Sequence, residues 1–268
     1  MEIENNLLEW DIVKSFMKRY NFPKKIKIKI IVTDNIEKEY KRHLKKYNKE
    51  YDYISFIDYN GMICVPNTIN EDTTLIINYD KIINYKENNC QVICTIFHEL
   101  IHAKDYYDYY KQYFDGRYDS SINRDSQYGF HNWSEFNAKR ISYFEYCNLI
   151  NEDKARSQEA LNNIKEHEIP LQNKIMEEYL IDDEIDMEEI IYNLMLYLGR
   201  YSVWEDLFPD EFNNNKMFPK ELKKYEPLIN ILYNHLKHNS KEFDYYIELK
   251  KLINYFKGEW VNLSNEKE

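Results

Sequence analysis

The sequence has few residues that interrupt regular structure, with only 5 Gly and 6 Pro among its 268 residues. Disordered and low-complexity chains are rich in such residues, whereas this chain has 43% hydrophobic residues arranged in short periodic groups. It also contains no Gly/Ser-rich linker and no internal repeat. We therefore expect an ordered protein with a sizeable core, built as one large or two small domains.

Signals for a membrane or for secretion are also missing. No apolar run approaches the roughly 20 residues that a membrane-spanning helix needs. The first ten residues, MEIENNLLEW, are acidic and lack the basic and apolar regions of a secretory signal. The four cysteines show no framework or metal-binding spacing. These absences predict a cytoplasmic protein with reduced thiols and no membrane association.

Positive charge is the scarcer sign, because 36 Lys and Arg stand against 47 Asp and Glu for a net charge of −11. A negative potential opposes binding to nucleic acid and to anionic membranes, so neither is an expected partner. The basic stretch KKIKIKI at Lys24–Ile30 runs against this trend. It alternates like a strand with one solvated face, which we interpret as a row of exposed lysines.

Hydrophobic periodicity predicts an α+β fold whose last half is mostly helical. In the first third, helical spacing at 7–20 and 36–47 flanks an alternating strand at 25–32. Two β-prone runs joined by Asn60-Gly61 predict a hairpin over 53–66, and Thr73–Tyr79 predicts another strand. Further helices are expected at 133–150, 152–180 with a break around Pro170, 187–205, 220–238 and 241–257. The expected domains are 1–150 and a helical subdomain 151–268.

The stretch TIFHELIHAKD places His98 and His102 four residues apart, with Glu99 directly after the first histidine. The surrounding apolar residues predict a largely buried helix, on which both imidazoles project from one face and can bind one metal ion. Glu99 stands beside them, where it can take a proton from water. The alternative is two hydrogen-bonded core histidines with an exposed glutamate, but buried polar groups need partners and a metal supplies them.

A third ligand is sought in HNWSEFNAKRISYFEY, where Glu135 follows His102 by 33 residues and Ala138 follows three residues later. The same carboxylate could instead cap a helix, because Asn132-Trp-Ser-Glu135 is a capping-box pattern. Asp108 is a competing ligand, but it requires a chain turn at Asp105, where the pattern reads as uninterrupted helix. Glu145 and His131 are further possibilities.

The order of strand, motif helix and following acid over about Thr73 to Cys147 resembles the zincin metallopeptidases of gluzincin type. In layout it is most similar to the ImmA/IrrE-like intracellular proteases and related proteins of phages and mobile elements. The resemblance implies a small twisted sheet packed on the motif helix, with zinc held by His98, His102 and Glu135 and with Glu99 as general base.

Two positions depart from these patterns. Ile101 stands where ImmA/IrrE-like proteins often have glycine, and Lys139 stands where thermolysin-like enzymes have an acid that orients a histidine. Residues that support the zinc ligands must therefore come from elsewhere in the chain.

The function expected from these features is zinc-dependent hydrolysis of peptide bonds in a protein or peptide substrate. The substrate is expected to add to a sheet edge, for which Thr73–Tyr79 is the candidate. Tyr143, His131 or Arg140 could stabilise the transition state. The helices after residue 150 are expected to complete the cleft or to dock a partner. The alternative is a non-catalytic zincin-like protein that binds a protein partner, although the presence of Glu99 favours the enzyme.

Overall fold

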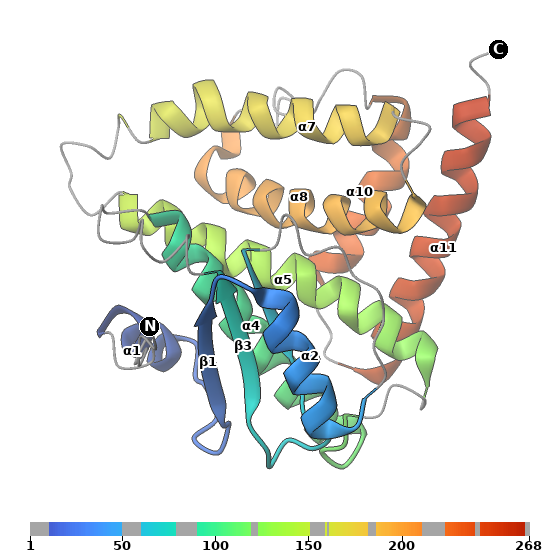
Figure 1. Ribbon diagram of the computed structural model, residues 1–268. Helices are drawn as coiled ribbons and strands as arrows, with labels where there is room; N and C mark the ends of the chain where they lie inside the picture. Colours follow the sequence, from blue (N-terminus) through green and yellow to red (C-terminus); the bar gives the residue numbers. More distant parts are fainter. Residues whose placement is uncertain are drawn as a thin grey trace. The chain divides into compact units, whose positions relative to one another are not determined.

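The computed structural model describes residues 11–49, 60–78, 90–118, 123–150, 159, 161–181, 186–210, 223–238 and 242–265. The chain forms two compact units, Met1–Asp119 and Ser120–Glu268. The first contains a three-stranded sheet with helices, and every regular element described in the second is helical (Figure 1). The predicted α+β class is therefore confirmed. No helix within the described ranges combines the length and the apolar character of a membrane span.

The strands that the structure describes in the first unit are β1 (Ile28–Thr33), β2 (Gly61–Cys64) and β3 (Thr73–Asn78), and they form one sheet. β3 lies in the middle, parallel to β1 and antiparallel to β2. The prediction that Thr73–Tyr79 is an edge strand is therefore wrong for the strands that the structure describes. The physical reason is visible in the residues TTLIIN, five of which are buried, as expected for a strand that is covered on both faces.

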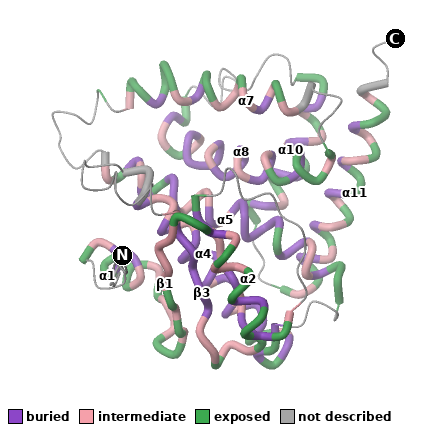
Figure 2. The backbone as a smooth tube through the Cα atoms, in the orientation of Figure 1, coloured by how far each residue is buried: buried purple, intermediate pink, exposed green. Residues whose placement is uncertain are grey.

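Helices cover both faces of this sheet, with α2 (Ile36–Tyr47) on one side and α4 (Cys90–Tyr113) on the other (Figure 1). Ile36 of α2 packs in one core cluster with Cys64 and Ile76. Figure 2 shows β3 as a buried strand of this unit. A short helix, α1 (Asp11–Arg19), packs against α4 through Phe16 and Phe97, whose stacked rings have centroids 3.9 Å apart.

The bounds of α2 agree with the predicted helix at 36–47 because both of its ends carry local signals. The Asn35 side chain accepts a hydrogen bond from the Lys38 backbone N–H at 2.9 Å. At the other end Asn48 adopts a left-handed conformation with φ of 52°, which terminates the helix. By contrast, the first strand of the predicted 53–66 hairpin falls mainly on residues 53–59, outside the described residues.

The helices of the second unit are long. They are α5 (Arg124–Ile150), α7 (Ile169–Ile181), α8 (Met187–Leu207), α10 (Glu226–Lys237) and α11 (Phe243–Asn265). α5 packs against α8 and α11, which is why it groups with this unit although the predicted domain boundary lies at residue 150.

The predicted break near Pro170 takes the form of a π-helical turn, Ile164–Glu168, directly before α7. The backbone N–H of Ile169 bonds to the carbonyl of Ile164, five residues earlier. Pro170 has no backbone N–H with which to continue an α-helical hydrogen-bond ladder. The chain therefore changes its hydrogen-bond pattern here but keeps its helical course.

Gly129 of α5 provides a test of helix packing in the second unit. A Cβ added there would lie 1.9 Å from the backbone carbonyl oxygen of Tyr246 in α11, so the two helices would have to separate. We expect Gly129→Ala to lower the free energy of unfolding by about 2 to 3 kcal/mol, at the upper end of overpacking effects. Urea denaturation measures this change.

The matched control is Gly258→Ala in α11, where an added Cβ has no heavy atom within 4 Å. Alanine is the better helix former, so this change is expected to stabilise the protein by about 0.5 to 1 kcal/mol. Equal effects of the two substitutions would contradict the close approach of α5 and α11.

Candidate metal centre

The two motif histidines lie one turn apart on α4 with their rings facing each other. The Nε2 atoms of His98 and His102 are 3.0 Å apart, and the ring centroids are 4.5 Å apart with the planes nearly perpendicular. His102 is buried and His98 is half-buried. The rest of this turn is anchored by Ile96, Leu100 and Ile101, each at most 1% exposed, so burial of the apolar stripe fixes where the imidazoles point.

The spacing of these nitrogens suits a shared metal ion. Two imidazole ligands of a tetrahedral zinc ion, each about 2.0 to 2.1 Å from the metal, lie roughly 3.3 Å apart, close to the observed 3.0 Å. One donor atom from each of His98, His102 and Glu135 lies within 4.8 Å of the others. We call these three residues the His-His-Glu group. Two imidazoles and one carboxylate form a donor set that fits zinc and leaves a fourth position for a reactant.

Glu135 lies well inside α5, because this helix begins at Arg124 and not near residue 133 as predicted. Asn132 is itself helical, and its side-chain amide donates to the Tyr128 carbonyl at 3.0 Å. The capping-box role of Glu135 is therefore wrong, since there is no helix start at this point. Glu135 is also buried, with a relative exposure of 7%. A buried carboxylate in a helix interior requires a compensating partner, and a cation is one.

The other candidate ligands, Asp108, Glu145 and His131, do not belong to the His-His-Glu group. α4 continues without a break through Asp105 and Asp108, which contradicts the chain turn that the Asp108 alternative requires. Asp108 instead forms an ion pair with Lys104, with a distance of 2.6 Å between carboxylate oxygen and Nζ. On α5, Glu145 is buried and His131 is exposed, and neither belongs to the His-His-Glu group.

Glu99 follows His98 directly on α4 and is buried. Its side chain lies next to Gly61 of β2. A Cβ added to Gly61 would be 3.2 Å from Cγ of Glu99 and 3.3 Å from Cγ2 of Thr95. Glycine at position 61 therefore leaves space for the Glu99 side chain.

Burial of the Cys64 thiol, and next the nearby negative charge of Glu99, raises the pKa of this thiol to about 12. The thiol therefore stays protonated at neutral pH.

Sequence reasoning missed this role of Gly61. It assigned Asn60-Gly61 to a hairpin turn, whereas Gly61 is the first residue of β2 and pairs with Ile77 of β3. A side-chain-free position in a short strand is a signal for close approach of another group, and that signal was present.

Tyr143 lies in a buried polar cluster of the second unit. Its hydroxyl donates to Glu168 at 2.9 Å and accepts from the indole N–H of Trp204 at 3.0 Å. Burial raises the pKa of this hydroxyl well above its usual range, so it stays protonated. The role of Tyr143 in stabilising a transition state stays a prediction, as does that of His131.

Comparisons with protein-family models, with curated proteins and with solved structures found no match for this chain.

Proposed function

We propose that the protein is a zinc-dependent metallopeptidase that hydrolyses peptide bonds. The observation that carries the proposal is the His-His-Glu group together with the buried Glu99, which lies on α4 beside the two histidines. A purely structural zinc site is usually closed by four protein ligands, whereas three ligands beside a spare carboxylate are typical of hydrolytic sites. His98, His102 and Glu135 are the proposed ligands.

Each residue of the proposed site has its own role in the reaction. A zinc ion held by the three ligands supplies Lewis acidity and makes water at the site a stronger acid. Glu99 takes a proton from the attacking water and returns it to the amine that leaves. Gly61 lies close against the Glu99 side chain, since a Cβ added at Gly61 would be 3.2 Å from Cγ of Glu99. Because Glu99 is only 7% exposed, bulk water has little access to its carboxylate.

The central position of β3 changes where a peptide substrate is expected. β2 lies against α4 at Gly61, next to Glu99, and it is an edge strand among the strands that the structure describes. We propose that β2, in place of β3, is the strand beside which a peptide binds in extended form. A peptide in that position would bring a backbone carbonyl near Glu99.

Removal of metal tests the proposed function. Cleavage of proteins in a cell lysate is expected to fall at least about tenfold after dialysis of the enzyme against a chelator, and to return with about one equivalent of Zn²⁺. New N-termini in the lysate, identified by mass spectrometry, measure this cleavage.

Ca²⁺ and Mg²⁺ serve as control ions, since both prefer oxygen ligands and should not restore activity. Cleavage that is unchanged after complete removal of metal would contradict a metallopeptidase. A zinc-loaded protein that generates no new N-termini would favour the alternative of a non-catalytic interaction protein.

A further inference from the structure

One short segment of this acidic chain carries an excess of positive charge. Residues 11–49 contain thirteen Lys and Arg but only four Asp and Glu, a balance of +9, although the whole chain carries −11. The remainder of the chain therefore carries −20. A protein-wide net charge does not describe the potential near these residues, because screening limits the reach of exposed charges to about 8 Å at physiological salt.

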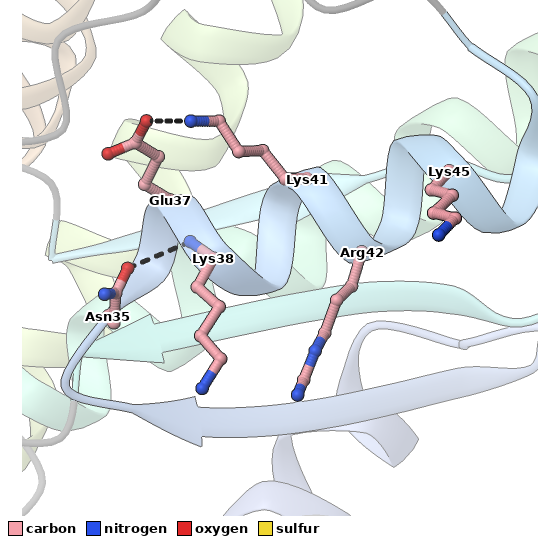
Figure 3. Close-up of a pocket in the computed structure, with 6 residues that line it drawn as sticks. All are labelled: Asn35, Glu37, Lys38, Lys41, Arg42 and Lys45. Atoms are coloured by element: carbon pink, nitrogen blue, oxygen red, sulfur yellow. Dashed lines mark hydrogen bonds and ion pairs between the residues drawn. The ribbon is translucent and has the colours of Figure 1, made fainter.

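On α2 the cationic side chains share one exposed face. Lys38, Arg42 and Lys45 follow at helical spacing, and the opposite face of the helix is buried through Ile36, Leu44 and Tyr47. These three cations help to line an open surface pocket of about 410 Å³. Lys38 and Arg42 extend from α2 toward β1 (Figure 3).

β1 continues this surface with lysines of its own. Lys29 and Ile31 alternate onto the same side of the strand, and Ile31 is paired with Ile76, which packs against α2. The exposed side chain of Lys29 therefore lies on the α2 side of the sheet, and exposed Lys27 precedes it by two residues. We call Lys27, Lys29, Lys38, Arg42 and Lys45 the basic surface.

Little of this charge is neutralised by the protein itself. Arg42 pairs with Glu39 at 2.6 Å, but its side chain is 64% exposed, and such surface pairs are weak. Within the part of the chain that the structure describes, no carboxylate pairs with the four lysines of the basic surface. A polyanion can therefore contact five cations at little cost.

The residue types of the basic surface indicate which class of polyanion it binds. Protein interfaces are depleted in lysine and rely on buried apolar and aromatic anchors. The large hydrophobic residues that are exposed among the described residues all belong to the second unit. The basic surface thus lacks an anchor for a protein partner or for insertion into a lipid bilayer. Distributed lysines suit phosphate groups because each ammonium acts as a point charge, and an arginine can donate two N–H groups to one phosphate.

We propose that the basic surface binds the phosphate backbone of nucleic acid. The contacts run from side chains to phosphates, so the affinity does not depend on base sequence and falls steeply with salt. This inference is independent of the proposed peptidase activity. It reverses the expectation of no nucleic-acid partner, which followed from the net charge of the whole chain.

The test is fluorescence anisotropy of a labelled DNA duplex of about 20 base pairs, titrated with the full-length protein. We expect a Kd of about 10 µM or lower at roughly 50 mM NaCl. If five side chains each neutralise one phosphate, the affinity should fall about 500-fold between 50 and 200 mM NaCl. The triple variant K29E/K38E/K45E is expected to bind at least about 30-fold more weakly at the lower salt concentration.

The matched control is K174E/K223E/K251E, which makes the same change in net charge at exposed positions of the second unit. It is expected to bind DNA within about threefold of the unmodified protein, since it leaves the five cations of the basic surface unchanged. Absence of DNA binding at 50 mM NaCl, or an equal loss in both triple variants, would overturn the proposal. Binding to vesicles that contain phosphatidylserine, without binding to DNA, would overturn it as well.

Discussion

Replacing His102 with alanine is expected to abolish stoichiometric zinc binding. The zinc content of the purified protein, measured by mass spectrometry of the metal, should fall from about one ion per chain to below about 0.1. The reason is geometric, because the His98 and His102 nitrogens 3.0 Å apart form the chelating pair, and a single imidazole with one carboxylate is a weak site. The loss of affinity should exceed the roughly 10- to 100-fold effect of removing an outer-shell partner.

Thermal unfolding gives a second readout of the same change. At a free zinc concentration about 1,000 times the Kd, the folded protein should gain about 4 kcal/mol by mass action, and His102→Ala should gain almost none. His235→Ala is the matched control, since this half-buried helical histidine lies outside the His-His-Glu group and stacks on Tyr245 at 4.4 Å between centroids. It should bind zinc normally. Stoichiometric zinc in His102→Ala, or none in the unmodified protein, would refute the site.

Glu135→Gln then identifies the third ligand. An amide is a poor ligand for zinc, so the variant should lose affinity to a degree that approaches that of His102→Ala. Unchanged zinc affinity would mean that the third donor is another residue, while the two histidines would still hold the ion. An error in the third ligand can therefore be told apart from an error in the whole site, because only the latter would leave zinc binding unchanged in His102→Ala.

The Glu135 helix illustrates where local sequence patterns reach their limit. Asn132-Trp-Ser-Glu135 has the residues of a helix start, yet α5 begins eight residues earlier than Asn132. The signal at that earlier start is Asn123, which has φ of 50° and whose side chain accepts from the Ser126 N–H at 3.3 Å. Both patterns are compatible with a cap, and only the packing of the whole helix on α8 and α11 decides between them.

The sheet shows a different limit. The existence of strands near 25–32 and 73–79 followed from side-chain alternation and β-branched residues, and both are present. The order of the strands in the sheet could not be predicted from local patterns, because β3 pairs with β1 and β2 through residues that are distant in the chain. The apolar run of Leu75–Ile77 did contain a usable signal, because a strand with an apolar residue on each face belongs in the centre of a sheet.

Glu99→Gln is expected to lower the rate of peptide hydrolysis by about 10²- to 10⁴-fold while leaving zinc content unchanged. Glutamine has nearly the same shape as glutamate, which matters because the Glu99 side chain lies close to Gly61 of β2. The amide cannot take a proton from water, so the variant isolates proton transfer from folding and from metal binding. Zinc content and the rate of substrate cleavage, measured on the same preparation, give the two readouts.

Asp108→Asn is the matched control, because it removes one negative charge from the same helix at a carboxylate that pairs with Lys104. It should retain full activity, since Asp108 lies outside the His-His-Glu group. If Glu99→Gln keeps both its zinc and its activity, the general-base role is wrong. If Glu99→Gln keeps its zinc and a protein partner is bound equally well by both forms with no cleavage by either, the site recognises that partner without hydrolysing it. The Glu99 carboxylate therefore separates an enzyme from a binding protein that has the same metal site.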